Sequence, residues 1–192
     1  ESDSVKVEPL GLILAIMPWN FPLWQIFRVL IPQLVVGNVV LIKPALNVPS
    51  TTLFWQKCSG ECPFFSCLLL SNDQVAQVIA DDRCVGVTLT GSVAAGKAVA
   101  SLASAVIKPV VLELGGSDPF IVCADADLED AVTALMKSRF QNAGQSCIAA
   151  KRLLLHESIK IRFLNQLAVA LENIVMGDPL NSVTTMGPCA RL

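Results

Sequence analysis

Continuous apolar runs alternate with amphipathic stretches along most of this chain. Nearly uninterrupted aliphatic runs are typical of strands in a parallel sheet covered on both faces, and helical spacing of apolar residues indicates amphipathic helices. Strands that alternate with helices predict an α/β fold with a mainly parallel sheet. The predicted strands are Leu10–Met17, Asn38–Lys43, Val85–Thr90, Val110–Leu114, Pro119–Val122 and Lys151–His156. The clearest predicted helices are Val93–Ile107, a helix from Asp127 to about Gln141, and Ile159–Val175.

The pair Gly115-Gly116 is the predicted boundary between two domains, residues 1–115 and 116–192. A glycine pair permits backbone angles that other residues resist, and the strand–helix pattern restarts after it. The stretch Phe54–Leu70 is the least regular part of the chain, because its cysteines, aromatic residues and Pro63 fit neither period well.

The composition adds a question about the surface. Hydrophobic residues make up 53% of the chain and charged residues 16%, against about 45–50% and about 25% in typical globular domains. Such a chain either enters a membrane or has much of its surface covered by something else. The longest stretch without a charged residue or histidine, Pro9–Phe27, is close to the length of a spanning helix, but Pro18 and Pro22 would interrupt the helical hydrogen bonds. The N-terminus is acidic and does not resemble a signal peptide, so we expect a cytoplasmic protein that does not associate with membranes.

Charge and cysteine usage narrow the class further. The net charge is −2 and there are no basic blocks, which argues against a nucleic-acid partner. Seven cysteines stand beside a single histidine, His156, and form no CxxC pair. This pattern predicts neither a disulfide framework nor a zinc site. A reactive cysteine here must be activated by groups other than histidine.

Five segments could carry chemistry. Thr90-Gly91-Ser92-x-x-x-Gly96 joins a strand to a helix, where the helix N-terminus could bind phosphate, although Ser92 could also simply cap the helix. Asn20, in the segment Pro18-Trp19-Asn20-Phe21-Pro22, could stabilise an oxyanion or belong to a plain turn. Lys43, at the end of the next strand, could hold a ribose or phosphate or lie in solvent.

The remaining two segments contain a carboxylate and a thiol. Glu113 lies in an apolar strand, where burial would raise its pKa and make it a plausible general base; the alternative is a strand-end acid exposed to water. Cys147 follows small polar residues in the loop Gln141–Ser146, a setting that suits a nucleophile. A buried structural cysteine is the ordinary alternative.

Taken in order, these motifs resemble those of the aldehyde dehydrogenase superfamily, from about Pro9 to Arg191. The matching motifs are PWNFP, the strand-end Lys43-Pro44, TGSxxxG, ELGG and GQSC. Within the superfamily, ELGGSDPFIV, GQSCIAAKR and MGDP resemble the NAD(P)-dependent succinate-semialdehyde dehydrogenases. The resemblance implies a Rossmann-like cofactor domain (residues 1–115) followed by the start of an α/β catalytic domain (residues 116–192).

The resemblance also implies a role for each site residue. Cys147 would attack the aldehyde, Glu113 would be the general base, and Asn20 with the Cys147 backbone N–H would form the oxyanion hole. The implied cofactor-binding residues are Trp19, Lys43, Gly91, Ser92, Gly96 and Leu114. The implied substrate-binding residues are Arg28, Trp24 and Gln141. Arg28 would clamp the distal carboxylate of the substrate, or it could simply extend to solvent.

Some positions depart from the family pattern. Leu46 replaces a glutamate that many members use to bind the adenosine ribose, so NAD and NADP are equally open as cofactor. Gln141 replaces a second arginine, and Ala149 replaces a second cysteine, so a single carboxylate clamp and no redox switch are expected. Phe54–Leu70 lacks the family's usual turn, which puts the packing of one helix of the cofactor domain in doubt.

The family's chains are more than twice this length, so we expect this chain to be part of a longer, homo-oligomeric protein. Its surplus apolar surface would then face missing segments and neighbouring subunits. The leading hypothesis is an enzyme that oxidises an aldehyde, with succinate semialdehyde as the expected substrate. The alternatives are a truncated, non-catalytic remnant or interaction module of the same fold, and a membrane-associated domain.

Overall fold

The structure, a computed structural model, describes residues 5–60 and 62–191. It divides into two compact units, residues 1–115 and 116–192. The division falls between Gly115 and Gly116. Each unit has its own sheet and its own apolar core, and each is described by itself.

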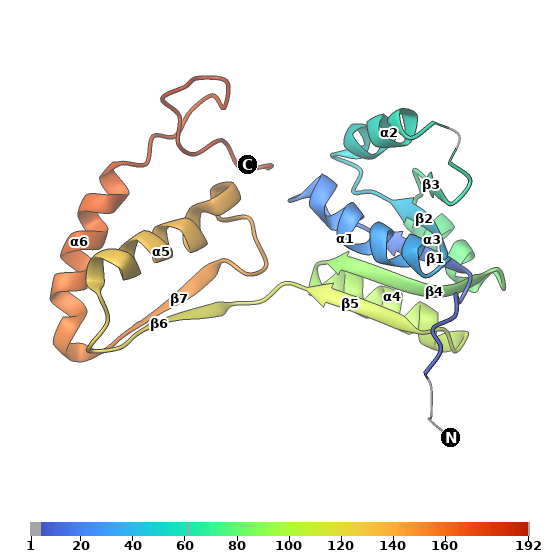
Figure 1. Cartoon of the computed structure of the whole chain (residues 1–192), viewed down its shortest axis with the longest axis horizontal. Helices are drawn as coiled ribbons and strands as arrows, with labels where there is room; N and C mark the ends of the chain where they lie inside the picture. Colours follow the sequence, from blue (N-terminus) through green and yellow to red (C-terminus); the bar gives the residue numbers. More distant parts are fainter. Residues whose placement is uncertain (1–4, 61, 192) are drawn as a thin grey trace. The chain divides into compact units, whose positions relative to one another are not determined.

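The first unit is built on a five-stranded sheet with the strand order β3-β2-β1-β4-β5 (Figure 1). All four strand pairs are parallel. The strands are β1 (Leu12–Ile16), β2 (Val39–Lys43), β3 (Phe65–Cys67), β4 (Cys84–Gly91) and β5 (Val110–Leu114). The predicted α/β fold with a parallel sheet is confirmed.

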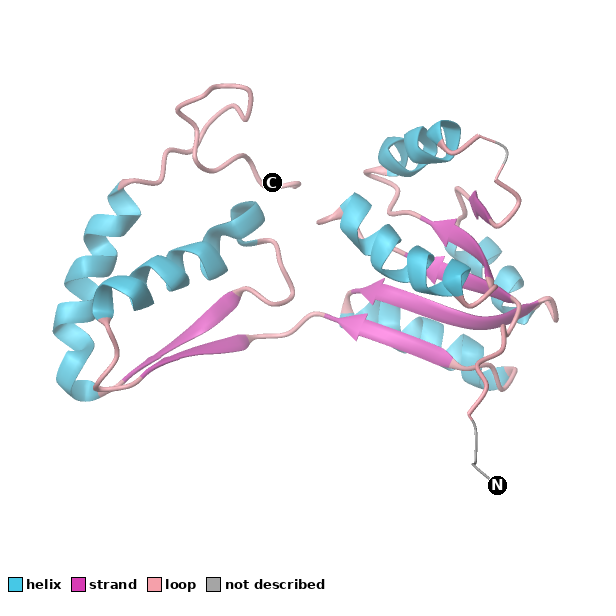
Figure 2. Ribbon diagram, in the orientation of Figure 1, coloured by secondary structure: helices cyan, strands magenta, loops and turns pink. Residues whose placement is uncertain are grey.

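Helices cover both faces of this sheet (Figure 2). The helices are α1 (Pro22–Val35), α2 (Pro49–Cys58), α3 (Asn72–Ala80) and α4 (Val93–Ala105). Successive residues of the central strand point to opposite faces. Leu14 packs in a cluster with residues of α3 and α4, and Ala15 packs in a second cluster with residues of α1. The near-continuous apolar strands of the sequence follow from this double coverage.

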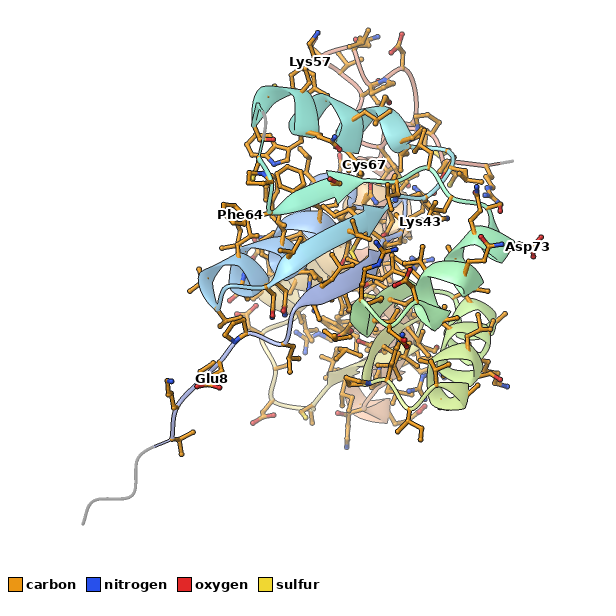
Figure 3. The ribbon with its side chains drawn as sticks, turned by 90° about the vertical axis from the view of Figure 1, so that its right-hand side faces the viewer. Glu8, Lys43, Lys57, Phe64, Cys67 and Asp73 are labelled. Atoms are coloured by element: carbon orange, nitrogen blue, oxygen red, sulfur yellow. The ribbon has the colours of Figure 1, made fainter. Side chains whose placement is uncertain are left out.

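The irregular stretch Phe54–Leu70 contains regular elements that the sequence did not predict. Its first residues complete α2, and the short strand β3 extends the sheet beside β2. Trp55 of α2 lies edge-on to Phe27 of α1, with ring centroids 4.8 Å apart, so this helix does pack on the unit. Figure 3 shows Phe64 and Cys67 at opposite ends of β3, with Cys67 at the same end of the sheet as Lys43.

The second unit combines a parallel strand pair with two helices. It contains β6 (Asp118–Val122), α5 (Leu128–Phe140), β7 (Ala150–Leu155) and α6 (Lys160–Glu172), with short 3-10 turns at Gln141–Gly144 and Glu157–Ile159. Asp127 caps α5 by accepting hydrogen bonds from two backbone N–H groups of its first turn. Phe163 of α6 is fully buried in the core of this unit.

One difference from the predicted elements has a physical reason. Helix α6 ends at Glu172 rather than Val175, because the Val175 N–H donates to Thr185 Oγ1 at 2.8 Å instead of to a carbonyl of the helix. The uncharged stretch Pro9–Phe27 divides into β1 and the first part of α1. Within residues 5–60 and 62–191, no helix is long and apolar enough to cross a membrane.

Candidate functional site

Most of the predicted site residues of the first unit lie at the carboxyl end of its parallel sheet. Trp19 and Asn20, both half-buried, follow β1. Lys43 ends β2 and is in register with Ile16 of β1. Gly91 ends β4 and is in register with Leu114 of β5. Ligands of open parallel sheets bind at the carboxyl ends of the strands.

The turn from β4 into α4 is a candidate phosphate site. Ser92 is the N-cap of α4, and its Oγ accepts a hydrogen bond from the Ala95 N–H at 3.2 Å. The capping role is therefore present, and it leaves the positive end of the helix dipole in place for an anion. Gly91 meets only ordinary contacts, so its neighbours do not require a glycine.

Gly96 has a packing role in the same turn. A Cβ atom at Gly96 would lie 2.6 Å from Leu114 Cδ2, closer than side-chain atoms approach. The absence of a side chain lets α4 lie directly on β5. These two predicted cofactor residues are thus brought into contact, and together they set the position of the α4 N-terminus.

The Lys43 side chain is half-buried at the end of β2. Burial lowers the pKa of its ammonium group from the ordinary value. The structure thus places a partly desolvated cation at the carboxyl end of the sheet, where Trp19 and Asn20 also lie. Removal of water strengthens the attraction of such a cation for a polar or anionic group.

The predicted substrate residue Arg28 and the predicted base Glu113 lie together. Arg28 Nη2 is 3.4 Å from Glu113 Oε1, and the two side chains are 36% and 51% exposed. Both line a cavity of about 290 Å³ between α1 and strands β4 and β5. Trp24 lies one helical turn before Arg28, and it is 65% exposed.

The expected burial of Glu113 is therefore wrong. Its strand is the outer strand next to β4, and alternate residues of β5 are exposed, including Val111 and Glu113. The apolar neighbours in the sequence suggested burial, but the α4 side of β5 is the packed face, and Glu113 lies on the opposite face. Arg28 also does more than extend to solvent, because its guanidinium contacts a carboxylate.

In the second unit, the loop between α5 and β7 has an unusual backbone. Gln141 is exposed and begins the 3-10 turn. Asn142 and Ala143 both have positive φ angles, 54° and 55°, and Gly144 follows with φ 74°. Non-glycine residues rarely adopt this conformation, which occurs preferentially at functional sites. A Cβ at Gly144 would also lie 3.0 Å from the Arg139 carbonyl oxygen.

Cys147 follows this loop and is half-buried. Two other thiols differ from it in setting: Cys84 is buried, and burial raises the pKa of the Cys67 thiol. Sequence reasoning missed Lys151, whose ammonium contacts backbone carbonyls around Cys147. A lysine at the start of a strand carries no signal of such a role. Within the described parts of the chain, no cluster of three His, Cys, Asp or Glu residues could hold a metal ion.

Comparison with known proteins places these features in context. The sequence profile of the aldehyde dehydrogenase family matches residues 1–191. The chain is 45% identical over 190 residues to a succinate-semialdehyde dehydrogenase [NADP(+)] of Mycobacterium avium. The matched residues cover 97% of this chain and 40% of that relative.

Solved structures of related proteins agree. The chain is similar to succinic semialdehyde dehydrogenase from Streptococcus pyogenes in complex with NADP+, with a TM-score of 0.89, 39% identity and coverage of 93% of this chain and 40% of that one. It is also similar to PnpE in complex with nicotinamide adenine dinucleotide, with a TM-score of 0.90, 32% identity and coverage of 96% and 39%. The chain spans about 40% of the length of the relatives it matches.

Proposed function

This chain belongs to the aldehyde dehydrogenase family, and we propose that it carries the nucleophile and much of the cofactor site of an enzyme that oxidises succinate semialdehyde to succinate. The observation that carries the choice of substrate is the Arg28 guanidinium on the wall of the cavity; the Arg28 side chain is 36% exposed and contacts the Glu113 carboxylate. A planar guanidinium suits a carboxylate, and succinate semialdehyde bears one at the end distant from its aldehyde. The relatives named for this substrate support the same choice.

The residues fit a thiol mechanism. By resemblance to the family, Cys147 would lose its thiol proton to water and its Sγ would bond to the aldehyde carbon, while the carbonyl oxygen becomes an oxyanion bound by the Asn20 amide and the Cys147 N–H. When bound, NAD or NADP supplies the acceptor for the hydride that leaves the thiohemiacetal carbon. Glu113 would then accept a proton from the water that attacks the resulting thioester, releasing succinate and the Cys147 thiol.

Several features of the first unit support a nucleotide site. Ser92 and the N-terminus of α4 would hold the pyrophosphate, with Gly96 and Leu114 fixing the helix on the sheet. Lys43 would hold the adenosine ribose. Leu46 is 67% exposed and brings no carboxylate that would repel a 2′-phosphate, so the proposal includes both NADP and NAD. Residues 1–115 would form part of the NAD(P)-binding domain, and residues 116–192 the first part of the catalytic domain.

Exposed apolar side chains support a covered surface in the working protein. Val111 is 62% exposed and Ile121 is 66% exposed. We propose that such residues face further segments or neighbouring subunits of a homo-oligomer, and that the protein works in the cytoplasm. The similarity to enzymes over nearly the whole chain does not favour the alternative of a non-catalytic remnant. A folded protein that binds NADP+ without turnover would support that alternative.

Replacing Arg28 with alanine tests the choice of substrate. We expect kcat/KM for succinate semialdehyde to fall by about 10²-fold, because the loss of one partner of a charge pair removes a few kcal/mol. For butanal, which has no carboxylate, the change should be small. The measurement is NADPH formation at 340 nm with each aldehyde at about physiological ionic strength. The exposed Arg83, paired with Asp81, provides the control variant Arg83→Ala; equal losses for both aldehydes in Arg28→Ala would refute the clamp.

Replacing Ser92 with alanine separates capping from phosphate binding. Loss of the cap should lower the free energy of unfolding by about 1 kcal/mol. Loss of a hydrogen bond to phosphate should also raise the Kd for NADP+ by about tenfold. Ser71 caps α3 with a full capping box, so Ser71→Ala is a matched control that should lose similar stability and keep the same Kd. Fluorescence titration of the tryptophans measures the Kd. Equal Kd values in the two variants would show that Ser92 acts only as a helix cap.

A further inference from the structure

A lysine ammonium contacts the backbone of the loop that carries Cys147. Lys151 belongs to β7, and its Nζ is 2.8 Å from the Cys147 carbonyl oxygen. The same Nζ is 3.0 Å from the Ser146 carbonyl oxygen and 3.4 Å from that of Ala149. An ammonium group has three N–H donors and no acceptor. These three carbonyl oxygens therefore match its complete set of donors.

The Ser146 carbonyl is held from two directions. Its oxygen also accepts the Ala149 N–H at 3.3 Å. A carbonyl oxygen has two lone pairs, and here one faces the turn and the other faces Lys151. Ser146 is 8% exposed, whereas Lys151 is exposed to solvent. The orientation of this peptide group is thus set by both contacts.

Holding the Ser146 carbonyl also sets the direction of the Cys147 N–H. Both groups belong to one planar peptide unit, and the described residues contain no cis peptide bond. In a trans peptide the C=O and N–H bonds point in opposite directions. The Cys147 N–H therefore points away from the Lys151 ammonium.

We propose that Lys151 is a positioning residue that holds the Cys147 backbone N–H as a donor to the oxyanion. The inference rests on the proposed function, because it requires Cys147 to attack a carbonyl carbon. Lys151 contacts the carbonyl side of the peptide and acts through the peptide group, not on the substrate. Without the ammonium, rotation of the Ser146–Cys147 peptide would turn the donor away from the developing charge.

Two reagents that react at the same sulfur distinguish this role from general support of the loop. With p-nitrophenyl acetate, the sulfur bonds to the ester carbonyl carbon, an oxyanion forms, nitrophenolate leaves with the electrons of the C–O bond, and the thiol proton passes to water. With iodoacetamide, the sulfur displaces iodide from a saturated carbon and the thiol proton again passes to water. Only the first reaction passes through an oxyanion. Mass spectrometry of the Cys147 peptide in the full chain measures each rate separately from the other cysteines.

We expect Lys151→Met to slow acylation of Cys147 by about 10²-fold, the effect of losing one oxyanion donor, and to leave its alkylation within about threefold. Lys151→Arg keeps the charge and several donors, so it should restore part of the acylation rate. Lys160, exposed at the start of α6, provides the control variant Lys160→Met, which should change neither rate. If Lys151→Met does not fold, as judged by circular dichroism, Lys151→Ala provides the same comparison, because alanine also lacks the N–H donors.

Two results would overturn the inference. Equal slowing of both reactions would show that Lys151 only supports the loop, and unchanged rates would show that it contributes nothing. A different result would overturn the proposed function. If Cys147 of the unchanged protein is alkylated but not acylated, it is not a nucleophile toward carbonyl groups, and the positioning role falls with it.

Discussion

Replacing Cys147 with serine should reduce NADPH formation from succinate semialdehyde by at least about 10³-fold. A thiol is ionised to a useful extent near neutral pH, whereas a serine hydroxyl needs an adjacent base to become a nucleophile. The chain has a single histidine, His156, which caps the short 3-10 turn Glu157–Ile159. The histidine that usually acts as the general base for a serine nucleophile is therefore not assigned at this position. The change from sulfur to oxygen is otherwise small, so folding should be preserved.

The matched control for this prediction is Cys123→Ser. Cys123 belongs to the same unit and is exposed after β6. Its replacement should leave turnover unchanged. Binding of NADP+ should be the same in both variants, because neither residue lies in the first unit. Turnover of Cys147→Ser close to that of the unchanged protein would exclude the thiol mechanism.

Replacing Phe163 with alanine should destabilise the second unit by about 3–5 kcal/mol. Phe163 is 0% exposed and packs at the centre of the core formed by β6, β7, α5 and α6. Its removal would leave a cavity that this small unit cannot close. A loss of this size is a large fraction of the total stability of a small domain. The Cys147 loop, which connects α5 to β7, should lose its order at the same time.

Hydrogen–deuterium exchange is the suitable measurement, because the two units need not unfold together. Amides of α5 and α6 should exchange much faster in Phe163→Ala, while amides of β1 and β4 should keep their protection. Ile161 lies on the same helix and is 75% exposed, so Ile161→Ala should change stability by less than about 0.5 kcal/mol. Unchanged exchange of α5 and α6 in Phe163→Ala would contradict the central position of this residue in the core.

Strands with uninterrupted aliphatic runs were predictable from the sequence. The runs at β1, β2 and β4 lie inside the sheet, and burial on both faces is the reason for their composition. β3 was not predictable, because it is short and follows the irregular segment around Pro63. Its place in the sheet depends on pairing with β2, a contact between distant residues. Short strands depend on such tertiary contacts more than on their own pattern.

The candidate site likewise contains some features that the local sequence predicts and others that depend on tertiary contacts. Ser92 at the start of α4 could be identified because capping follows local sequence rules. The exposure of Glu113 could not, since it depends on β5 lying at the edge of the sheet. The Arg28–Glu113 contact joins residues of α1 and β5, and nothing in the local pattern of either indicates it. Lys151 was missed for a similar reason, because the backbone carbonyls that it contacts carry no sequence signal.

The exclusively parallel pairing of the first sheet also has a consequence for how this unit folds. The pairing of β1 with β4 joins Leu12 to Cys84. These two strands can pair only after the residues of α1, β2, α2, β3 and α3 between them have been synthesised. Pairings between residues so distant in sequence lose more chain entropy on closure and slow folding. During synthesis, β1 and β2 leave the ribosome well before β4. We therefore expect the β1–β2–β3 side of the sheet to assemble first, and the β4–β5 side, which carries Ser92 and Glu113, to join it last.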